Sequence, residues 1–289
     1  MNAPGLVESV LHPTDFSLAS ERAFAHALAI ALLRNTRLTI LNVAGDGDRS
    51  GDLSRFPVVK STLERWGLAE AGNAWQTVFG RPGFSVANVA LTGRSSSRKI
   101  AEFIEQTGVD LLVLATGSNE PAGWLRGSTA VKIARRTRTM ALFVPAWAER
   151  DIVTVKGQFR LKNVLVPFDR VPDPARAVEF ARRAAERLGA GDVTITLLHV
   201  GAGPALPRVA AEDGPGWVFR HEYATGDPVG KIVEVAMNKE AELIVMPTAG
   251  RQGLLDAVLG STTEQVLRRS PCPLLAVPAA AGSGQRRRA

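Results

Sequence analysis

The sequence contains a single cysteine, Cys272, among its 289 residues. One thiol excludes an internal disulfide framework and any zinc site that needs several cysteines. Its place between two prolines, in the run SPCPLL, favours a small buried side chain over a reactive thiol. So little cysteine suits a reducing compartment, and we expect a cytoplasmic protein.

The sequence also lacks a long hydrophobic run. The longest apolar stretch near its start, Ala23 to Leu33, is too short to span a bilayer and contains His26. Acidic residues, Asp15 and Glu21, precede it where a signal peptide carries basic ones. We therefore expect no membrane segment and no targeting segment.

The net charge of +7 is not concentrated in a way that indicates nucleic-acid binding. Three of the charges, Arg286 to Arg288, lie in residues 280–289, which we expect to be a disordered tail. The other basic residues are spread over both halves and are not interleaved with aromatic residues. We expect no nucleic-acid partner.

No arrangement of residues typical of catalysis stands out. The four histidines, His12, His26, His199 and His221, are scattered, and His12 and His199 read as polar residues at strand ends. Ser95 to Ser97 fit the N-cap of a helix and lack the G-x-S-x-G pattern of a nucleophile elbow.

What the sequence does contain is an internal repeat with a period of about half the chain. Five segments of the first half recur in the same order in the second: VLHPTDFS and VLVPFDRV, RLTILNV and VTITLLHV, LTGRSSSRKIAEFI and ATGDPVGKIVEVA, DLLVLATG and ELIVMPTA, and GSTAVKIARRTRTMALFVP and GSTTEQVLRRSPCPLLAVP. Such a period indicates duplicated domains and not a solenoid.

Each half alternates short, nearly continuous apolar runs with stretches of helical periodicity. Apolar runs of this kind are typical of parallel strands that are covered on both faces. The pattern predicts an α/β fold of two tandem, doubly wound parallel-sheet domains. We expect a first domain at 1–148, a linker at 149–160 in which DIVTV is an alternative edge strand, and a second domain at 161–279.

The two halves differ after their second strand. Fifty positions separate Val43 from Gly93, whereas twenty-six separate Val200 from Gly226. The first half has room for a helix there, and the second has a short segment rich in glycine and proline. We expect the second domain to have a shortened or missing second helix, with a bare sheet face for the other half or a partner chain.

A glycine-punctuated loop, Pro247 to Val266, follows a strand of the second half. Gly250, Gly253 and Gly260 permit close backbone approach, and the stretch from Ser261 to Glu264 fits a capping box. Unpaired N–H groups at a helix start favour a phosphate, whereas a plain loop before a capped helix is the alternative. No Gly-Lys-Ser/Thr follows, so the loop is not a P-loop.

The repeated pattern resembles the universal stress protein family, of the adenine-nucleotide α-hydrolase-like superfamily. The resemblance rests on strand-Pro-x-Asp, on His199-Val200 and on the run from Leu243 to Pro278. Nucleotide-binding members have the signature G-x2-G-x9-G-S/T. Here Gly250 is its second glycine and Gly260-Ser261 close it, while Pro247 stands at its first glycine.

That resemblance implies an adenine-nucleotide site in the second half. The ligand would be ATP, with ADP and AMP as alternatives and Mg²⁺ as an optional companion ion. The residues of the site would be Pro167 and Asp169 at the adenine or ribose end, the main chain of Val200 at the adenine, and Gly250, Gly253, Gly260, Ser261 and Thr262 at the phosphates. Pro247 removes an N–H donor and adds bulk.

The first half departs further from the signature. Asp15 and Gly127-Ser128 remain, but Ala115 and Ser118 stand at the two leading glycines. Glu120 and Pro121 fall within the spacer, where a carboxylate would repel a phosphate. We expect the nucleotide motif of this half to be degenerate, with Gly117 or Gly123 as a partial substitute for the missing glycines.

Three functions remain open. The first is a nucleotide-binding stress-response module, and the second is a nucleotide-independent interaction or dimerisation protein. The third, an enzyme such as a slow ATPase, is the least favoured because the S-G-G-x-D-S loop of related pyrophosphatases is absent. The resemblance also implies that Met140–Pro145 and Pro273–Pro278 pair as an internal pseudo-dimer, with a homodimer as a further option.

Overall fold

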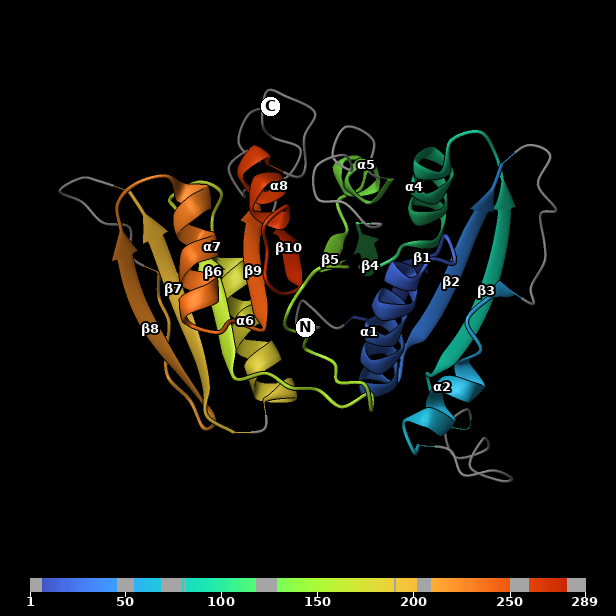
Figure 1. Cartoon of the computed structure of the whole chain (residues 1–289), viewed down its shortest axis with the longest axis horizontal. Helices are drawn as coiled ribbons and strands as arrows, with labels where there is room; N and C mark the ends of the chain where they lie inside the picture. Colours follow the sequence, from blue (N-terminus) through green and yellow to red (C-terminus); the bar gives the residue numbers. More distant parts are fainter. Residues whose placement is uncertain are drawn as a thin grey trace, which may run out of the picture. The chain divides into compact units, whose positions relative to one another are not determined.

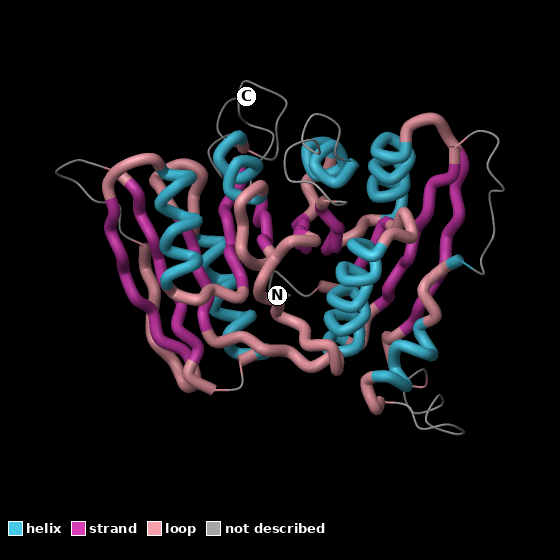
Figure 2. The backbone as a smooth tube through the Cα atoms, in the orientation of Figure 1, coloured by secondary structure: helices cyan, strands magenta, loops and turns pink. Residues whose placement is uncertain are grey.

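The computed structural model describes residues 7–45, 55–68, 80, 82–117, 129–189, 191–201, 209–249 and 260–279. The chain divides into two compact units, and the boundary in the sequence falls between Arg160 and Leu161. Strands and helices alternate along most of each unit (Figure 1, Figure 2).

The first unit has one parallel sheet of strand order β3-β2-β1-β4-β5. Its elements in chain order are β1 (Ser9–Pro13), α1 (Leu18–Arg34), β2 (Arg37–Ala44), α2 (Val59–Arg65), β3 (Ser85–Thr92), α4 (Ser96–Thr107), β4 (Leu111–Thr116), α5 (Thr129–Arg136) and β5 (Met140–Pro145).

The second unit repeats this topology, with the order β10-β9-β6-β7-β8 and all its pairs parallel. Its elements are β6 (Asn163–Pro167), α6 (Ala175–Leu188), β7 (Val193–Val200), β8 (Trp217–Ala224), α7 (Pro228–Asn238), β9 (Leu243–Thr248), α8 (Ser261–Leu267) and β10 (Leu274–Pro278). The predicted α/β class with two doubly wound parallel sheets is confirmed.

Small side chains bring the first helix of each unit close to its sheet. Buried alanines recur every four residues, at Ala23, Ala27 and Ala31 in α1 and at Ala177, Ala181 and Ala185 in α6. Positions spaced by four lie on one face of a helix, so each series forms a narrow packing face. α1 contacts β1 and β4, and α6 contacts β6 and β9.

The units differ between their second and third strands, as the spacing predicted. The first has α2 there, whereas residues 201 and 209–216, the described part of the second, contain no helix. The side chain of Arg182 lies 5.6 Å from the centre of the Trp217 ring. This cation–π contact covers the start of β8 with a side chain of α6.

The linker and two strands differ from the elements that the sequence predicted. Residues 149–160 do not add an edge strand, because Val153 and Phe159 form an isolated antiparallel bridge within a turn. β3 and β8 were not among the apolar runs identified, because about half of their residues face outward and interrupt the hydrophobic pattern. Within the described ranges no helix is long and apolar enough to cross a membrane.

Candidate functional site

Each sheet has a point at which its strand order reverses, between β1 and β4 and between β6 and β9. The strands share few partners there: β6 and β9 pair only at Val164 with Leu243 and at Leu165 with Ile244. Beyond Leu165 the two strands separate. In open α/β sheets ligands bind at this point, outside the carboxyl ends of the strands.

Two prolines face this separation in the second unit. Ile244 and Thr248 both hydrogen-bond toward β10, so the backbone of Pro247, between them in alternation, is directed toward β6. Phe168 hydrogen-bonds toward β7, so Pro167 is directed toward β9. The missing N–H of Pro247 therefore falls where pairing has already ended, which explains how a central strand accommodates a proline.

A cavity of about 260 Å³ opens at this point. Of the predicted site residues, Pro167, Asp169, Val200, Gly260 and Thr262 line it, and Ser261 does not. Gly250 and Gly253 lie outside the described residues. Its other walls are Phe168, Val171, Pro172, Leu198, Pro228, Ile232, Met246, Pro247, Thr248, Ala249 and Thr263. Most of these residues are apolar. Apart from Pro247, no motif assigned them to the site, and the folded topology brings them together.

The cavity has apolar walls and one carboxylate. The side chain of Asp169 is 64% exposed, and the Arg170 amide donates to its Oδ1 at 2.7 Å. Among the described lining residues there is no lysine or arginine. The volume lies just below the ~300–1,000 Å³ typical of ligand pockets and suits a nucleoside-sized group.

The capping box predicted at Ser261 is wrong. Gly260 is the N-cap of α8, with extended backbone angles of φ −64° and ψ 153°, and no side chain caps the helix. Ser261 is already the first helical residue, so its hydroxyl is one position too late to act as the cap. A Cβ added to Gly260 would meet no atom within 4 Å, because this glycine faces open space.

Asp15, the counterpart of Asp169 in the first unit, is engaged within its own helix start. Its Oδ1 accepts hydrogen bonds from the Ser17 amide at 3.0 Å, the Ser17 hydroxyl at 2.6 Å and the Ser20 hydroxyl at 2.7 Å. Burial raises the pKa of this carboxyl, but the hydrogen bonds from Ser17 and Ser20 outweigh it and hold the pKa below its usual value.

Other positions of the first unit that correspond to the nucleotide site are filled by aromatic side chains or lie outside the described residues. Phe16, at a positive φ of 64°, packs edge-on against Phe56 at 5.4 Å and beneath Arg55 at 4.6 Å. The Trp147 ring lies against Gly117 at the end of β4, where a Cβ would collide with it. Ser118, Glu120, Pro121, Gly123, Gly127 and Ser128 lie outside the described residues. The degeneracy of the nucleotide motif in this unit stays a prediction.

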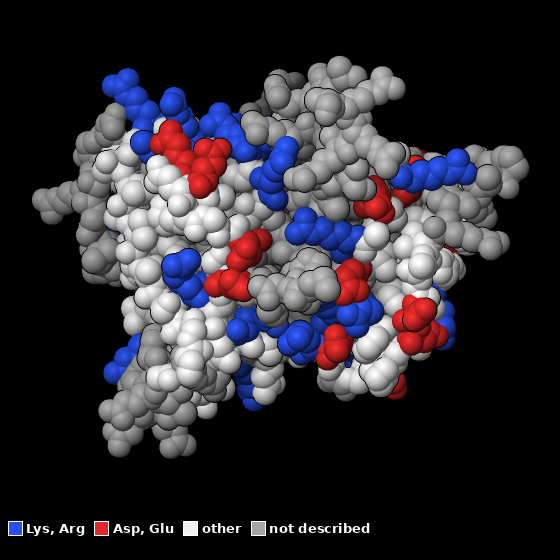
Figure 3. Space-filling model, turned by 180° about the vertical axis from the view of Figure 1, so that it is seen from behind, with Lys and Arg blue, Asp and Glu red and all other residues white. Residues whose placement is uncertain are grey.

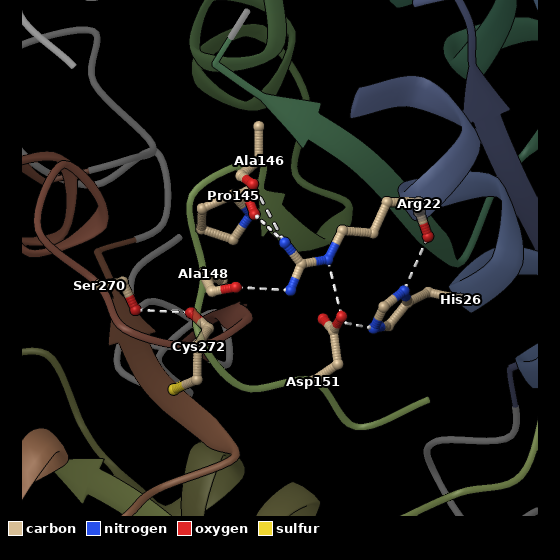
Figure 4. Close-up of polar contacts among 8 residues, drawn as sticks. All are labelled: Arg22, His26, Pro145, Ala146, Ala148, Asp151, Ser270 and Cys272. Atoms are coloured by element: carbon tan, nitrogen blue, oxygen red, sulfur yellow. Dashed lines mark hydrogen bonds and ion pairs between the residues drawn. The ribbon is translucent and has the colours of Figure 1, made fainter. Parts of the chain in front are cut away.

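Several side chains that drew attention in the sequence have structural partners. The fully buried His12 donates from Nδ1 to the Val113 carbonyl at 3.0 Å, and burial lowers its pKa to about 4. Ser95 is the N-cap of α4, as predicted, but its side chain makes no capping bond. Cys272 is buried, and its carbonyl accepts from the Ser270 hydroxyl at 2.6 Å (Figure 4).

A cluster in the first unit joins α1 to the end of β5 and to the linker (Figure 4). Arg22 donates to Asp151 at 2.7 Å, and the Nε2 of His26 lies 3.3 Å from the same carboxylate. Arg22 also donates to the carbonyls of Pro145, Ala146 and Ala148. Within the described residues no group of three metal-ligating side chains comes together.

The face drawn in Figure 3 has basic and acidic side chains interspersed. Several ion pairs join neighbours on one helix, as in Arg98 with Glu102, Arg182 with Glu179 and Lys231 with Glu234. Such pairs mark solvated helix faces and contribute little to stability.

Comparison with known proteins identifies the relatives of this chain. The model of the universal stress protein family matches residues 7–145 and 208–278. A universal stress protein of Methanocaldococcus jannaschii is 46% identical over 143 residues, covering 84% of that protein and 42% of this chain. Two solved structures share the fold over 94% of this chain. A universal stress protein from Archaeoglobus fulgidus is covered to 98% of its length, with a TM-score of 0.60 and 17% sequence identity. A putative universal stress protein from Pseudomonas aeruginosa is covered to 94% of its length, with a TM-score of 0.62 and 15% sequence identity.

Proposed function

The chain belongs to the universal stress protein family, whose model matches both units, and on this premise we propose that it is a stress-response protein that binds an adenine nucleotide in the cavity of its second unit. The observation that carries the proposal is this cavity at the point of strand-order reversal. It unites Pro167 and Asp169 after β6, Val200 at the end of β7, and Gly260 and Thr262 at the start of α8.

The lining suits a nucleoside in a definite orientation. The carboxylate of Asp169 is exposed and can accept hydrogen bonds from ribose hydroxyls. The apolar walls formed by Val171, Ile232 and Met246 suit the faces of a base. Gly260 and the Thr262 hydroxyl would meet the phosphates, together with Gly250, the second glycine of the motif, and Gly253 of the same loop. ATP is the proposed ligand, with ADP and AMP as alternatives and Mg²⁺ as an optional companion.

The competing proposal is a nucleotide-independent interaction or dimerisation protein. It draws support from Pro247, which occupies the first glycine of the motif, and from the lack of basic residues among the described lining. In this reading the fold serves partner contacts only. An enzymatic role, such as slow ATP hydrolysis, is less favoured and needs steady-state turnover that disappears in Asp169→Asn.

Mass spectrometry of the denatured, freshly purified full-length protein tests the nucleotide proposal. We expect ATP or ADP to be released, and millimolar ATP to raise the melting temperature of nucleotide-free protein. Gly260→Asp places a negative charge at the proposed phosphate position without a steric clash, because a Cβ there meets nothing within 4 Å. Gly260→Ala is the matched control and should retain binding. No released nucleotide and no thermal shift would favour the competing proposal.

We also propose a cytoplasmic location and an internal pseudo-dimer in which the last strands of the two units pair. Size-exclusion chromatography with light scattering separates a monomeric pseudo-dimer from a further homodimer. A homodimer would extend the proposal to contacts between two chains.

A further inference from the structure

In both units, a side chain at the end of the second strand bonds the loop that carries the aspartate. In the second unit, the Nδ1 of His199 donates to the Phe168 carbonyl at 3.2 Å. In the first unit, the Nδ2 of Asn42 donates to the Thr14 carbonyl at 2.8 Å. Phe168 and Thr14 each directly precede an aspartate, Asp169 or Asp15.

The two contacts occupy the same register position. β1 pairs Pro13 with Leu41, and β6 pairs Pro167 with Leu198. The donor follows the paired leucine by one residue in each unit, and the acceptor follows the paired proline by one residue. An amide and an imidazole thus make the same bond, so the hydrogen bond recurs while the residue type changes.

This bond falls where the backbone ladder would otherwise continue. The Phe168 amide donates to the Leu198 carbonyl at 2.9 Å, and in a regular parallel ladder the Phe168 carbonyl would next accept from the Val200 amide. Among the backbone hydrogen bonds of the described residues, none joins Val200 to Phe168. The imidazole of His199 donates a hydrogen bond to that carbonyl instead.

The Val200 amide therefore lacks this backbone acceptor and points toward the cavity. Gly201 donates to Ala224 of β8, so by alternation the polar backbone groups of Val200 are directed toward the β6 side. Val200 and Pro247 both line the cavity. The Val200 N–H has no backbone acceptor among the described residues, and a bound base can provide one.

The imidazole is held firmly enough to act in this way. Its side chain is only 10% exposed, and its Nδ1 lies 3.9 Å from the Oδ1 of Asp169. The Phe168 ring packs at 5.8 Å between ring centres. Gly201 closes the other side, where an added Cβ would lie 2.7 Å from the Nε2 of His199.

We propose that His199 is the positioning residue of the nucleotide site: its Nδ1–H fixes the Phe168–Asp169 backbone and leaves the Val200 amide to donate to the ligand. The proposal rests on the proposed function, since the ligand is the adenine nucleotide assigned above. His199 acts through Asp169 and Val200 and need not touch the nucleotide.

The test compares three variants of the full-length chain. His199→Leu removes the donor, His199→Asn supplies the amide that the first unit uses at Asn42, and Asn42→Leu removes the equivalent bond in the first unit. Titration calorimetry with ATP measures affinity, thermal unfolding confirms folding, and amide hydrogen exchange of residues 168–172 without ligand measures the loop.

We expect His199→Leu to weaken ATP binding about tenfold, as for the loss of one buried hydrogen bond, and to speed exchange of residues 168–172. His199→Asn should restore affinity to within about threefold of wild type and slow the exchange again, and Asn42→Leu should leave ATP affinity unchanged. Folded His199→Leu with wild-type affinity and exchange would overturn the proposal, as would His199→Asn that behaves like His199→Leu. Wild-type protein that binds no ATP overturns the proposed function, while the exchange measurement still decides whether His199 fixes the loop.

Discussion

Asp15 and Asp169 follow the first strands of the two units at equivalent positions, but their carboxylates have different partners. The Oδ1 of Asp15 accepts three hydrogen bonds from Ser17 and Ser20 at the start of α1. Asp169 is 64% exposed and borders the cavity, and its Oδ1 accepts a hydrogen bond from the Arg170 amide. The duplicated aspartate therefore holds the start of α1 in one unit and borders the cavity in the other.

This difference predicts opposite effects of the same substitution. Asp169→Asn should weaken ATP binding about tenfold and leave stability nearly unchanged, because it removes an exposed charged acceptor. Asp15→Asn should leave ATP affinity unchanged and lower the free energy of unfolding by about 1 kcal/mol, because it weakens the hydrogen bonds at the start of α1. Calorimetry and urea unfolding measure the two effects. Equal losses of affinity in both variants would contradict the assignment of the site to the second unit.

We predict that replacing Pro247 raises the affinity for ATP. Pro247→Gly restores an N–H directed toward the gap between β6 and β9 and removes the pyrrolidine ring from the cavity wall. We expect ATP to bind about threefold to tenfold more tightly, at a cost of about 1 kcal/mol in unfolding free energy from the added freedom of the unfolded chain. Pro247→Ala restores the N–H with a smaller change in flexibility. Weaker binding in both variants would show that the proline contributes to the site.

Much of the fold was predictable because the central strands are buried on both faces. The apolar runs that became β1, β4, β6 and β9 are nearly continuous, and the repeat matches β1 with β6 and β4 with β9. β3 and β8 were missed because exposed residues interrupt them, as Arg220 and His221 do in β8.

The site was predictable only where a motif carried it. Pro-x-Asp located Pro167 and Asp169, whereas the wall residues Val171, Pro228 and Ile232 come from separate segments with no shared pattern. The role of His199 depends on register, because its bond to Phe168 exists only when Pro167 pairs with Leu198. Pairing of this kind is set by tertiary structure and not by local sequence.

The buried His12 predicts a pH-dependent loss of stability. Burial lowers its pKa from 6.5 to about 4. Between these values the unfolded chain binds a proton that the folded chain does not, so the free energy of unfolding falls as the pH falls from 6.5 to 4. The loss is about 1.4 kcal/mol per pH unit, or roughly 3 kcal/mol in total.

His12→Val tests this account, since Val166 occupies the same position in the second unit. Urea unfolding of both proteins at pH 7 and pH 4.5 should show a smaller pH dependence for the variant. An unchanged difference between the two pH values would assign the effect to other groups.

We predict that the ordering of the linker at residues 149–160 depends on the side chain of Arg22. Its guanidinium donates to Asp151 and to three backbone carbonyls, those of Pro145, Ala146 and Ala148. Lysine cannot form this planar set of bonds, so Arg22→Lys should lower the unfolding free energy by about 2 kcal/mol and speed proteolysis within residues 149–160. Arg176 occupies the equivalent position and donates to the Pro278 carbonyl, so Arg176→Lys is the matched control with a smaller effect. Similar cleavage of both variants would contradict this role for Arg22.

The most direct test of the central claim is the number of ATP molecules that the full-length chain binds at saturation, measured by equilibrium dialysis against labelled ATP. We predict one ATP per chain, bound by the wild type and by Asp15→Asn and lost in Gly260→Asp. No binding at millimolar ATP, two molecules per chain, or undiminished binding by Gly260→Asp would contradict a single nucleotide site in the second unit.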